Sequence, residues 1–108
     1  MDIKNYFEQK KNQSNKTLAN LSLNSTFELA NNFERIYKAR LMLDIISYAE
    51  ENVLKNNISE NLLKFRERLI NQIITKEQMN SSSVVSNACS VIEENLKKEI
   101  LHVIQLYI

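Results

Sequence analysis

The sequence predicts an all-α fold, an antiparallel helical bundle of three main helices preceded by a short helix or arm. Apolar residues recur at steps of three and four over long stretches, which is the spacing of one helix face. The 108 residues include no Gly and no Pro, and no run of alternating β-branched residues that would form strands. Short polar breaks join the helical stretches, so each helix is expected to pack against its neighbour in sequence. The main helices are expected at about 25–55, 58–78 and 83–108.

Residues 1–24 are the least defined part of the chain. Ile3 and Phe7 lie one helical turn apart, but the segment 9–17 is wholly polar. A short amphipathic helix followed by a polar stretch fits this pattern, and so does an arm that is partly disordered. We therefore expect an N-terminal arm or short helix, followed by a single helical-bundle domain over 25–108.

The first main helix is expected to begin at Ser25 and to end at Asn56–Asn57. Ser25 and Glu28 have the spacing of a capping box, in which each side chain accepts a hydrogen bond from the backbone N–H of the other residue. After Gly, Asn is the residue that best adopts the left-handed conformation found just beyond the end of a helix. The same capping-box spacing recurs at Asn57–Glu60, where the second main helix is expected to begin.

The second main helix carries one continuous apolar stripe, which is typical of a helix that faces a core. Its members are Ile58, Leu62, Phe65, Leu69 and Ile73, widened by Leu63, Ile70 and Ile74. The break at Met79–Ser83 that follows is dense in residues that cap helices.

The last helix has the most regular stripe of the chain. Glu93–Lys97 and Glu94–Lys98 fall outside it and are expected on a solvated face, where each pair is worth roughly 0.2–0.5 kcal/mol. The stripe comprises Val85, Cys89, Ile92, Leu96, Ile100, Val103 and Tyr107.

Two stretches carry more apolar residues than one helix face can hold. Residues 41–49 place apolar side chains in nearly every direction around the helix, and residues 100–108 continue beyond the stripe. A helix that is hydrophobic all round is buried all round. We expect this surplus to pack against a second copy or another protein; the alternatives are coverage by the N-terminal arm and packing within the chain. The expected interface residues are Leu41, Met42, Ile45, Ile46, Leu101, Ile104 and Ile108.

Arg40 and Asp44 lie one turn apart within the apolar part of the first main helix. Such a pair can form a charge-assisted hydrogen bond, and a partly buried pair can fix helix register or subunit orientation. The alternative is an exposed pair at the solvent edge of a wide stripe.

Enzyme chemistry is not expected from this composition. Without Gly, the chain lacks the loops with which nucleotide-binding folds hold phosphates. Cys89 and His102 are the only Cys and His, and neither has partners at metal-ligand spacing. We expect Cys89 to be a small buried hydrophobe and His102 to be a surface or interface residue. With no acid–base pair, nucleophile triad or metal set, we expect no catalytic activity, no cofactor and no metal.

The net charge of +1 gives no global field that would attract nucleic acid or an anionic membrane. The candidate phosphate contacts are Lys64, Arg66 and Arg68 on the second main helix. Glu60 and Glu67 lie close to them in sequence. Nucleic-acid binding is therefore kept as an alternative.

The expected function is that of a small non-enzymatic protein–protein interaction module, a homodimer that regulates, inhibits or chaperones another protein. The alternatives are a nucleic-acid-binding regulator and a self-assembling structural subunit. The start of the chain has no apolar region of a secretory signal, and no apolar run is long enough to span a bilayer, so we expect a cytoplasmic protein. Asn, Ile and Lys make up 37 of 108 residues, which AT-rich codons would produce, so a bacterial or phage origin is expected.

Overall fold

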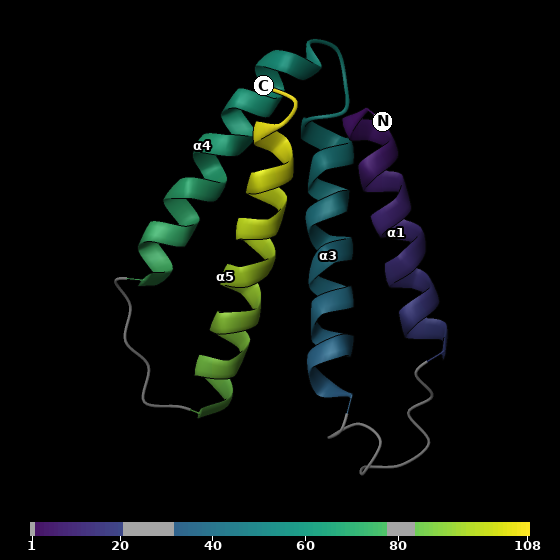
Figure 1. The fold of residues 1–108 in the computed structure, drawn as a ribbon, viewed down its shortest axis with the longest axis vertical. Helices are drawn as coiled ribbons and strands as arrows, with labels where there is room; N and C mark the ends of the chain where they lie inside the picture. Colours follow the sequence, from purple (N-terminus) through teal and green to yellow (C-terminus); the bar gives the residue numbers. More distant parts are fainter. Residues whose placement is uncertain (1, 21–31, 78–83) are drawn as a thin grey trace. The chain divides into compact units, whose positions relative to one another are not determined.

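A computed structural model describes residues 2–20, 32–77 and 84–108. These residues are all-helical and contain no strand, which confirms the predicted class for this part of the chain. The helices are α1 (Ile3–Asn20), α3 (Phe33–Asn52), α4 (Ile58–Glu77) and α5 (Val84–Gln105), as labelled in Figure 1.

The chain divides into two compact units, Met1–Ser47 and Tyr48–Ile108, and the boundary falls within α3. The first unit contains α1 and most of α3, which run alongside each other in opposite directions (Figure 1). The second contains the last turn of α3 with α4 and α5. A single domain over 25–108 stays a prediction.

Helix α1 is one continuous helix of 18 residues that includes the polar segment 9–17. It begins at an N-cap, because the Asp2 carboxylate accepts a hydrogen bond of 2.8 Å from the Asn5 backbone N–H. The sequence pattern did not predict this cap. Ile3, Phe7 and Ser14 are its buried residues and lie on one face.

Helix α3 has a broad buried face. The predicted start at Ser25 and the Ser25–Glu28 capping box lie outside the described residues. The helix ends at Asn52, earlier than predicted, and the backbone N–H groups of Val53 and Leu54 both donate to the Ala49 carbonyl at 2.8 Å. Its buried residues are Ile36, Ala39, Met42, Ile45, Ile46 and Ala49.

The connection between α3 and α4 depends on two Asn residues. Asn57 has a φ of 65°, the left-handed conformation predicted for this position, but it directly precedes α4 instead of following the last turn of α3. The Asn61 side-chain amide donates to the Val53 carbonyl at 3.3 Å and to the Asn56 carbonyl at 3.0 Å. These bonds hold residues 53–57 against the start of α4.

The capping box predicted at Asn57–Glu60 is not formed. The Glu60 carboxylate instead lies 3.9 Å from the Lys64 ammonium group, one turn further along α4. The backbone carbonyl of Asn57 still accepts the first helical hydrogen bond, from the Asn61 N–H at 3.0 Å. The predicted start of this helix is therefore correct, although the side-chain hydrogen bonds expected to cap it are absent.

Helices α4 and α5 pack against each other as an antiparallel pair (Figure 1). The core-facing stripe of α4 is as predicted: Leu62, Phe65, Leu69 and Ile73 are buried and Ile58 is half-buried. The predicted break at Met79–Ser83 falls on residues that are not described, apart from the fact that α4 ends before it and α5 begins after it.

The buried face of α5 is rotated relative to the predicted stripe. Leu96 and Ile100 are buried as expected, but Val103 is only half-buried and Tyr107 is 36% exposed. Ile104 is fully buried. Because successive residues turn by about 100° around a helix, this face is centred nearer to Ile104 than the spacing alone predicts.

Candidate functional site

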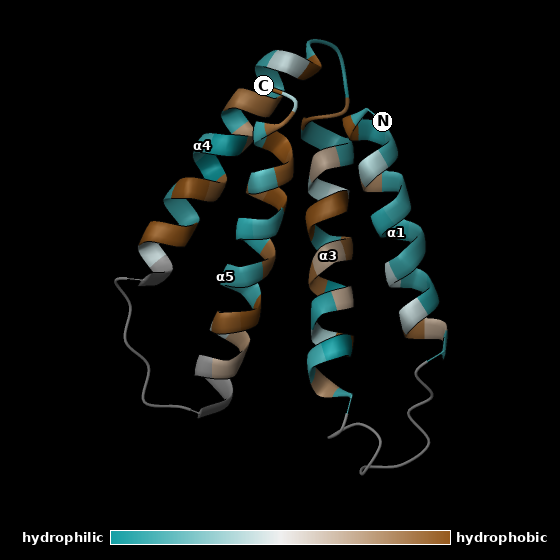
Figure 2. Ribbon diagram, in the orientation of Figure 1, coloured by the Kyte–Doolittle hydropathy of each residue, from teal (hydrophilic) through white to brown (hydrophobic). Residues whose placement is uncertain are grey.

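Helix α4 carries exposed apolar side chains beside its buried face. Leu63 is 41% exposed and Ile74 is 47% exposed, while Ile70 is half-buried. Steps of seven and four residues place these three on one line along the helix. Figure 2 shows the hydrophobic residues recurring along α4 between hydrophilic ones. We call Leu63, Ile70 and Ile74 the α4 stripe.

A second group of exposed apolar residues follows α5. Leu106 is 71% exposed, Tyr107 36% and Ile108 50%. The backbone N–H groups of Leu106 and Tyr107 donate to the carbonyls of Val103 and Ile104 at 3.0 and 2.9 Å, which extends α5 by a tight turn. In the antiparallel pair, residues 106–108 lie at the end where α4 begins, the end that also carries Leu63 (Figure 1).

The end of α3 is held on α4 by ring contacts within the second unit. The rings of Tyr48 and Phe65 lie 5.5 Å apart between centroids. The guanidinium carbon of Arg68 lies 4.6 Å from the centre of the Tyr48 ring, within the range of a cation–π contact. These contacts fix which side of α4 faces the Tyr48 ring. They therefore also fix the direction in which the α4 stripe points within the second unit.

The three candidate phosphate contacts each have another partner in the structure. Lys64 lies 3.9 Å from the Glu60 carboxylate, and Arg66 lies 3.6 Å from the Glu67 carboxylate. Arg68 stacks over Tyr48. Because two of the three cations face carboxylates, little excess positive charge remains on α4 for a polyanion.

The predicted interface residues fall into two groups. Leu41 and Leu101 are half-buried, and Ile108 is exposed. The others lie in the core of the chain: Met42, Ile45, Ile46 and Ile104. Their membership of an interface between chains stays a prediction. The sequence pattern identified α4's exposed apolar residues as a widening of its stripe, but it gave no sign that they were the more accessible set.

Arg40 and Asp44 are both exposed on α3. Within the described part of the chain, neither residue takes part in an ion pair. Ser47, which shares their side of the helix, is exposed as well. This arrangement agrees with the alternative of an exposed pair at the solvent edge of α3. That the pair fixes helix register or subunit orientation stays a prediction.

The predicted Glu93–Lys97 ion pair is formed on α5, but its expected place on a solvated face was wrong, because the pair is largely buried. The Lys97 ammonium group lies 2.7 Å from the Glu93 carboxylate, and the two side chains are only 10% and 19% exposed. The neighbouring Lys98–Glu94 pair, at 2.9 Å, has exposures of 52% and 23%. The sequence showed both pairs with identical spacing, and the rotation of the buried face of α5 is what separates them.

The residues that could act in catalysis or bind a metal do not form a cluster within the described residues. Cys89 is half-buried, so the expectation of a fully buried position was wrong, and His102 is exposed. No group of three His, Cys, Asp or Glu residues that could hold a metal ion occurs within residues 2–20, 32–77 and 84–108. None of the helices described is both long enough and apolar enough to cross a lipid bilayer.

No protein-family model, no curated protein and no solved structure matches this chain. The function is therefore argued from the chain's own residues, and the apolar surface of the second unit is the feature with the clearest physical consequence.

Proposed function

We propose that this protein is a non-enzymatic helical interaction module that forms a homodimer and binds another protein in order to regulate, inhibit or chaperone it. The observation that carries the proposal is the α4 stripe, together with the exposed residues 106–108. Single exposed apolar residues are ordinary on protein surfaces, whereas apolar residues that form a contiguous patch mark interaction sites.

The α4 stripe fits self-association because of its position along the helix. In a two-fold symmetric dimer the same surface patch is used by both copies. If two α4 helices pack in opposite directions, Leu63 of one copy faces Ile74 of the other. The pairing brings both copies of each exposed apolar residue into the contact. Lys64 lies toward the edge, where a polar rim is expected. The exposed Glu67 lies on the same side of α4 as the stripe, one turn after Leu63, and its carboxylate is 3.6 Å from the Arg66 guanidinium group.

The energy available is moderate. Burial of a Leu or Ile side chain that was fully exposed contributes about 1.5–3 kcal/mol, and Leu63 and Ile74 start 41% and 47% exposed. Association has to overcome a loss of translational and rotational freedom of about 4 kcal/mol or more. Four such side chains across a symmetric contact, with residues 106–108 added from each copy, are therefore needed for a stable dimer.

The proposal is tested by placing a charge on the stripe. We expect Leu63→Asp and Ile74→Asp each to convert the dimer to a monomer in sedimentation velocity, because each variant desolvates two carboxylates in a symmetric interface. Val91→Asp is the matched control: Val91 is 56% exposed on α5 and lies on the side of that helix opposite to its buried residues. This variant should remain a dimer.

Far-UV circular dichroism shows whether each variant has kept its helices. A dimer that persists in both stripe variants, with helicity intact, contradicts the proposed surface. Mass that grows with concentration without reaching a plateau contradicts a closed dimer and favours the self-assembling structural subunit.

A further inference from the structure

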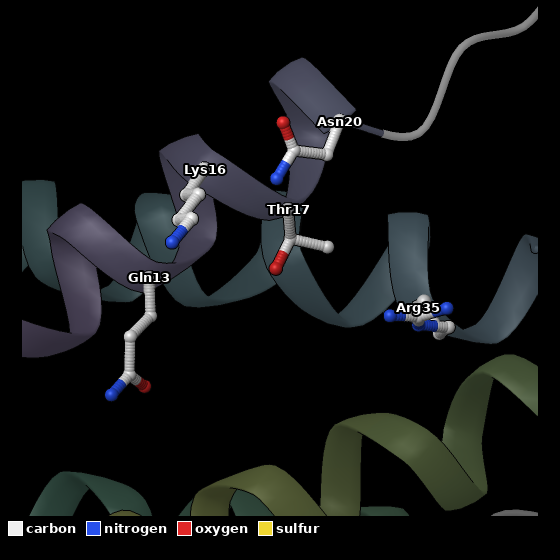
Figure 3. Close-up of a pocket in the computed structure, with 5 residues that line it drawn as sticks. All are labelled: Gln13, Lys16, Thr17, Asn20 and Arg35. Atoms are coloured by element: carbon white, nitrogen blue, oxygen red, sulfur yellow. The ribbon is translucent and has the colours of Figure 1, made fainter.

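The first unit contains a pocket between α1 and α3 whose described lining residues all have polar side chains. Its volume is about 400 Å³. Figure 3 shows four of its side chains on the last turns of α1 and one on α3. The lining residues are Gln13, Lys16, Thr17, Asn20 and Arg35.

The spacing of the four α1 residues explains why they line the same pocket. Gln13, Lys16, Thr17 and Asn20 follow steps of three, one and three, so they share one side of α1. Arg35 is in the first turn of α3, which runs opposite to α1. Thr17 is half-buried and the other four are exposed, so their polar groups are accessible to a ligand from solvent.

Every lining side chain named can donate a hydrogen bond. Lys16 and Arg35 are cations, the amides of Gln13 and Asn20 have N–H groups, and Thr17 has a hydroxyl. These five include no carboxylate. Glu34, the neighbour of Arg35, is exposed on the same turn of α3 and is not one of them.

We propose that this pocket binds the phosphate group of a small molecule. A phosphate monoester carries about −1.5 to −2 charges at neutral pH and offers three acceptor oxygens. Two cations and three neutral donors match both its charge and its oxygens. A carboxylate has half that charge, and the Arg35 guanidinium fork alone would satisfy it.

The surroundings favour an anion. Helix α1 carries Lys4, Lys10, Lys11 and Lys16 against Glu8, so its own charge is positive. Arg35 lies in the first turn of α3, where the helix dipole gives a partial positive charge. The pocket volume of about 400 Å³ lies near the lower end of the range of about 300–1,000 Å³ found for small-molecule sites. This leaves room for a small organic group beside the phosphate.

The pocket lies in the first unit and uses none of the residues of the proposed interaction surface. Its test and the dimer test can therefore fail independently of each other.

The probes are glycerol 3-phosphate, inorganic phosphate and malonate, titrated at low salt into the ¹⁵N-labelled protein and followed by NMR. We expect saturable shifts in the amide resonances of residues 13–20 and 33–36 with the two phosphates. Malonate should bind at least about fivefold more weakly, because it presents fewer oxygens at one point. Tighter binding of glycerol 3-phosphate than of inorganic phosphate assigns the site to a phosphorylated molecule, and equal binding assigns it to the free ion; both support a phosphate site.

Lys16→Gln and Arg35→Gln should each weaken phosphate binding by at least about fivefold. Each variant removes a charge-assisted hydrogen bond to the phosphate, and such a bond contributes more than an ordinary exposed ion pair. Both positions are exposed, so the helices should remain intact. Lys4→Gln is the control: it removes the same charge from the exposed surface of α1, 12 positions earlier in the sequence. No saturable shift, equally tight malonate binding, or an equal loss in Lys4→Gln would overturn the proposal.

Discussion

At the scale of single residues, the rotation of α5's buried face separates side chains that the sequence pattern did not distinguish. Ile104 is fully buried, whereas Leu106 is 71% exposed. We expect Ile104→Ala to lower the free energy of unfolding by about 2–5 kcal/mol, because it leaves a cavity in the core. Leu106→Ala should change it by less than about 0.5 kcal/mol.

Urea denaturation of both variants measures this difference at protein concentrations low enough to keep the chain monomeric. Equal effects of the two substitutions would contradict the rotated face. The same comparison explains why a charge at Ile104 is a poor probe of association: it would unfold the chain first.

The two Glu–Lys pairs of α5 provide a second contrast between residues. Lys97 and Glu93 are 10% and 19% exposed, whereas Lys98 is 52% exposed. We expect Lys97→Ala to cost about 1–3 kcal/mol of stability, because it removes a 2.7 Å ion pair from the partly buried Glu93 carboxylate. Lys98→Ala should cost about 0.5 kcal/mol or less.

Chemical denaturation at low and high salt distinguishes the two pairs. Salt screens an exposed pair more than a buried one, so only the Lys98 effect should shrink. If Lys97→Ala and Lys98→Ala lower the free energy of unfolding by the same amount, the buried pair contributes no more to stability than the exposed one.

At the scale of elements, the turn between α3 and α4 requires a left-handed residue at Asn57. A β-branched side chain is strained at a φ of 65°, so Asn57→Val should destabilise the protein by about 1–3 kcal/mol. Asn57→Gly should change stability by less than about 1 kcal/mol, because Gly adopts this conformation freely.

Asn56→Val is the control, since Asn56 is also exposed and its φ is not positive. Thermal unfolding of the three variants gives the comparison. If Val is tolerated as well at 57 as at 56, the backbone there does not need the left-handed conformation.

The helices also differ in how much of their buried faces the sequence predicted. The centre of the core face of α4, at Leu62, Phe65, Leu69 and Ile73, was predicted correctly, because these residues form one strong stripe. The predicted widening of this face was wrong at Leu63 and Ile74, which are exposed. The stripe of α5 was less accurate, since apolar residues lie on both sides of it and the neighbouring helix decides which side packs. The Asp2 cap was not predicted, because the polar segment 9–17 has no apolar residues that would indicate the helix that Asp2 begins.

At the scale of the whole molecule, the apolar surplus predicted association but did not distinguish the exposed Ile108 from residues that the chain itself buries. Met42, Ile45, Ile46 and Ile104 are buried in the chain's own core. Spacing along one helix gives the directions in which side chains point, but it does not give the elements that cover them. The α4 stripe and the pocket between α1 and α3 both depend on that information, so only the structure brought them forward as candidates.

Sedimentation velocity of the unmodified chain, over about three decades of concentration, shows whether it forms the proposed homodimer. The chain has a mass of 12.7 kDa. We predict a plateau at twice this value, with dissociation on dilution. A mass that stays at 12.7 kDa at every concentration would contradict the proposed homodimer.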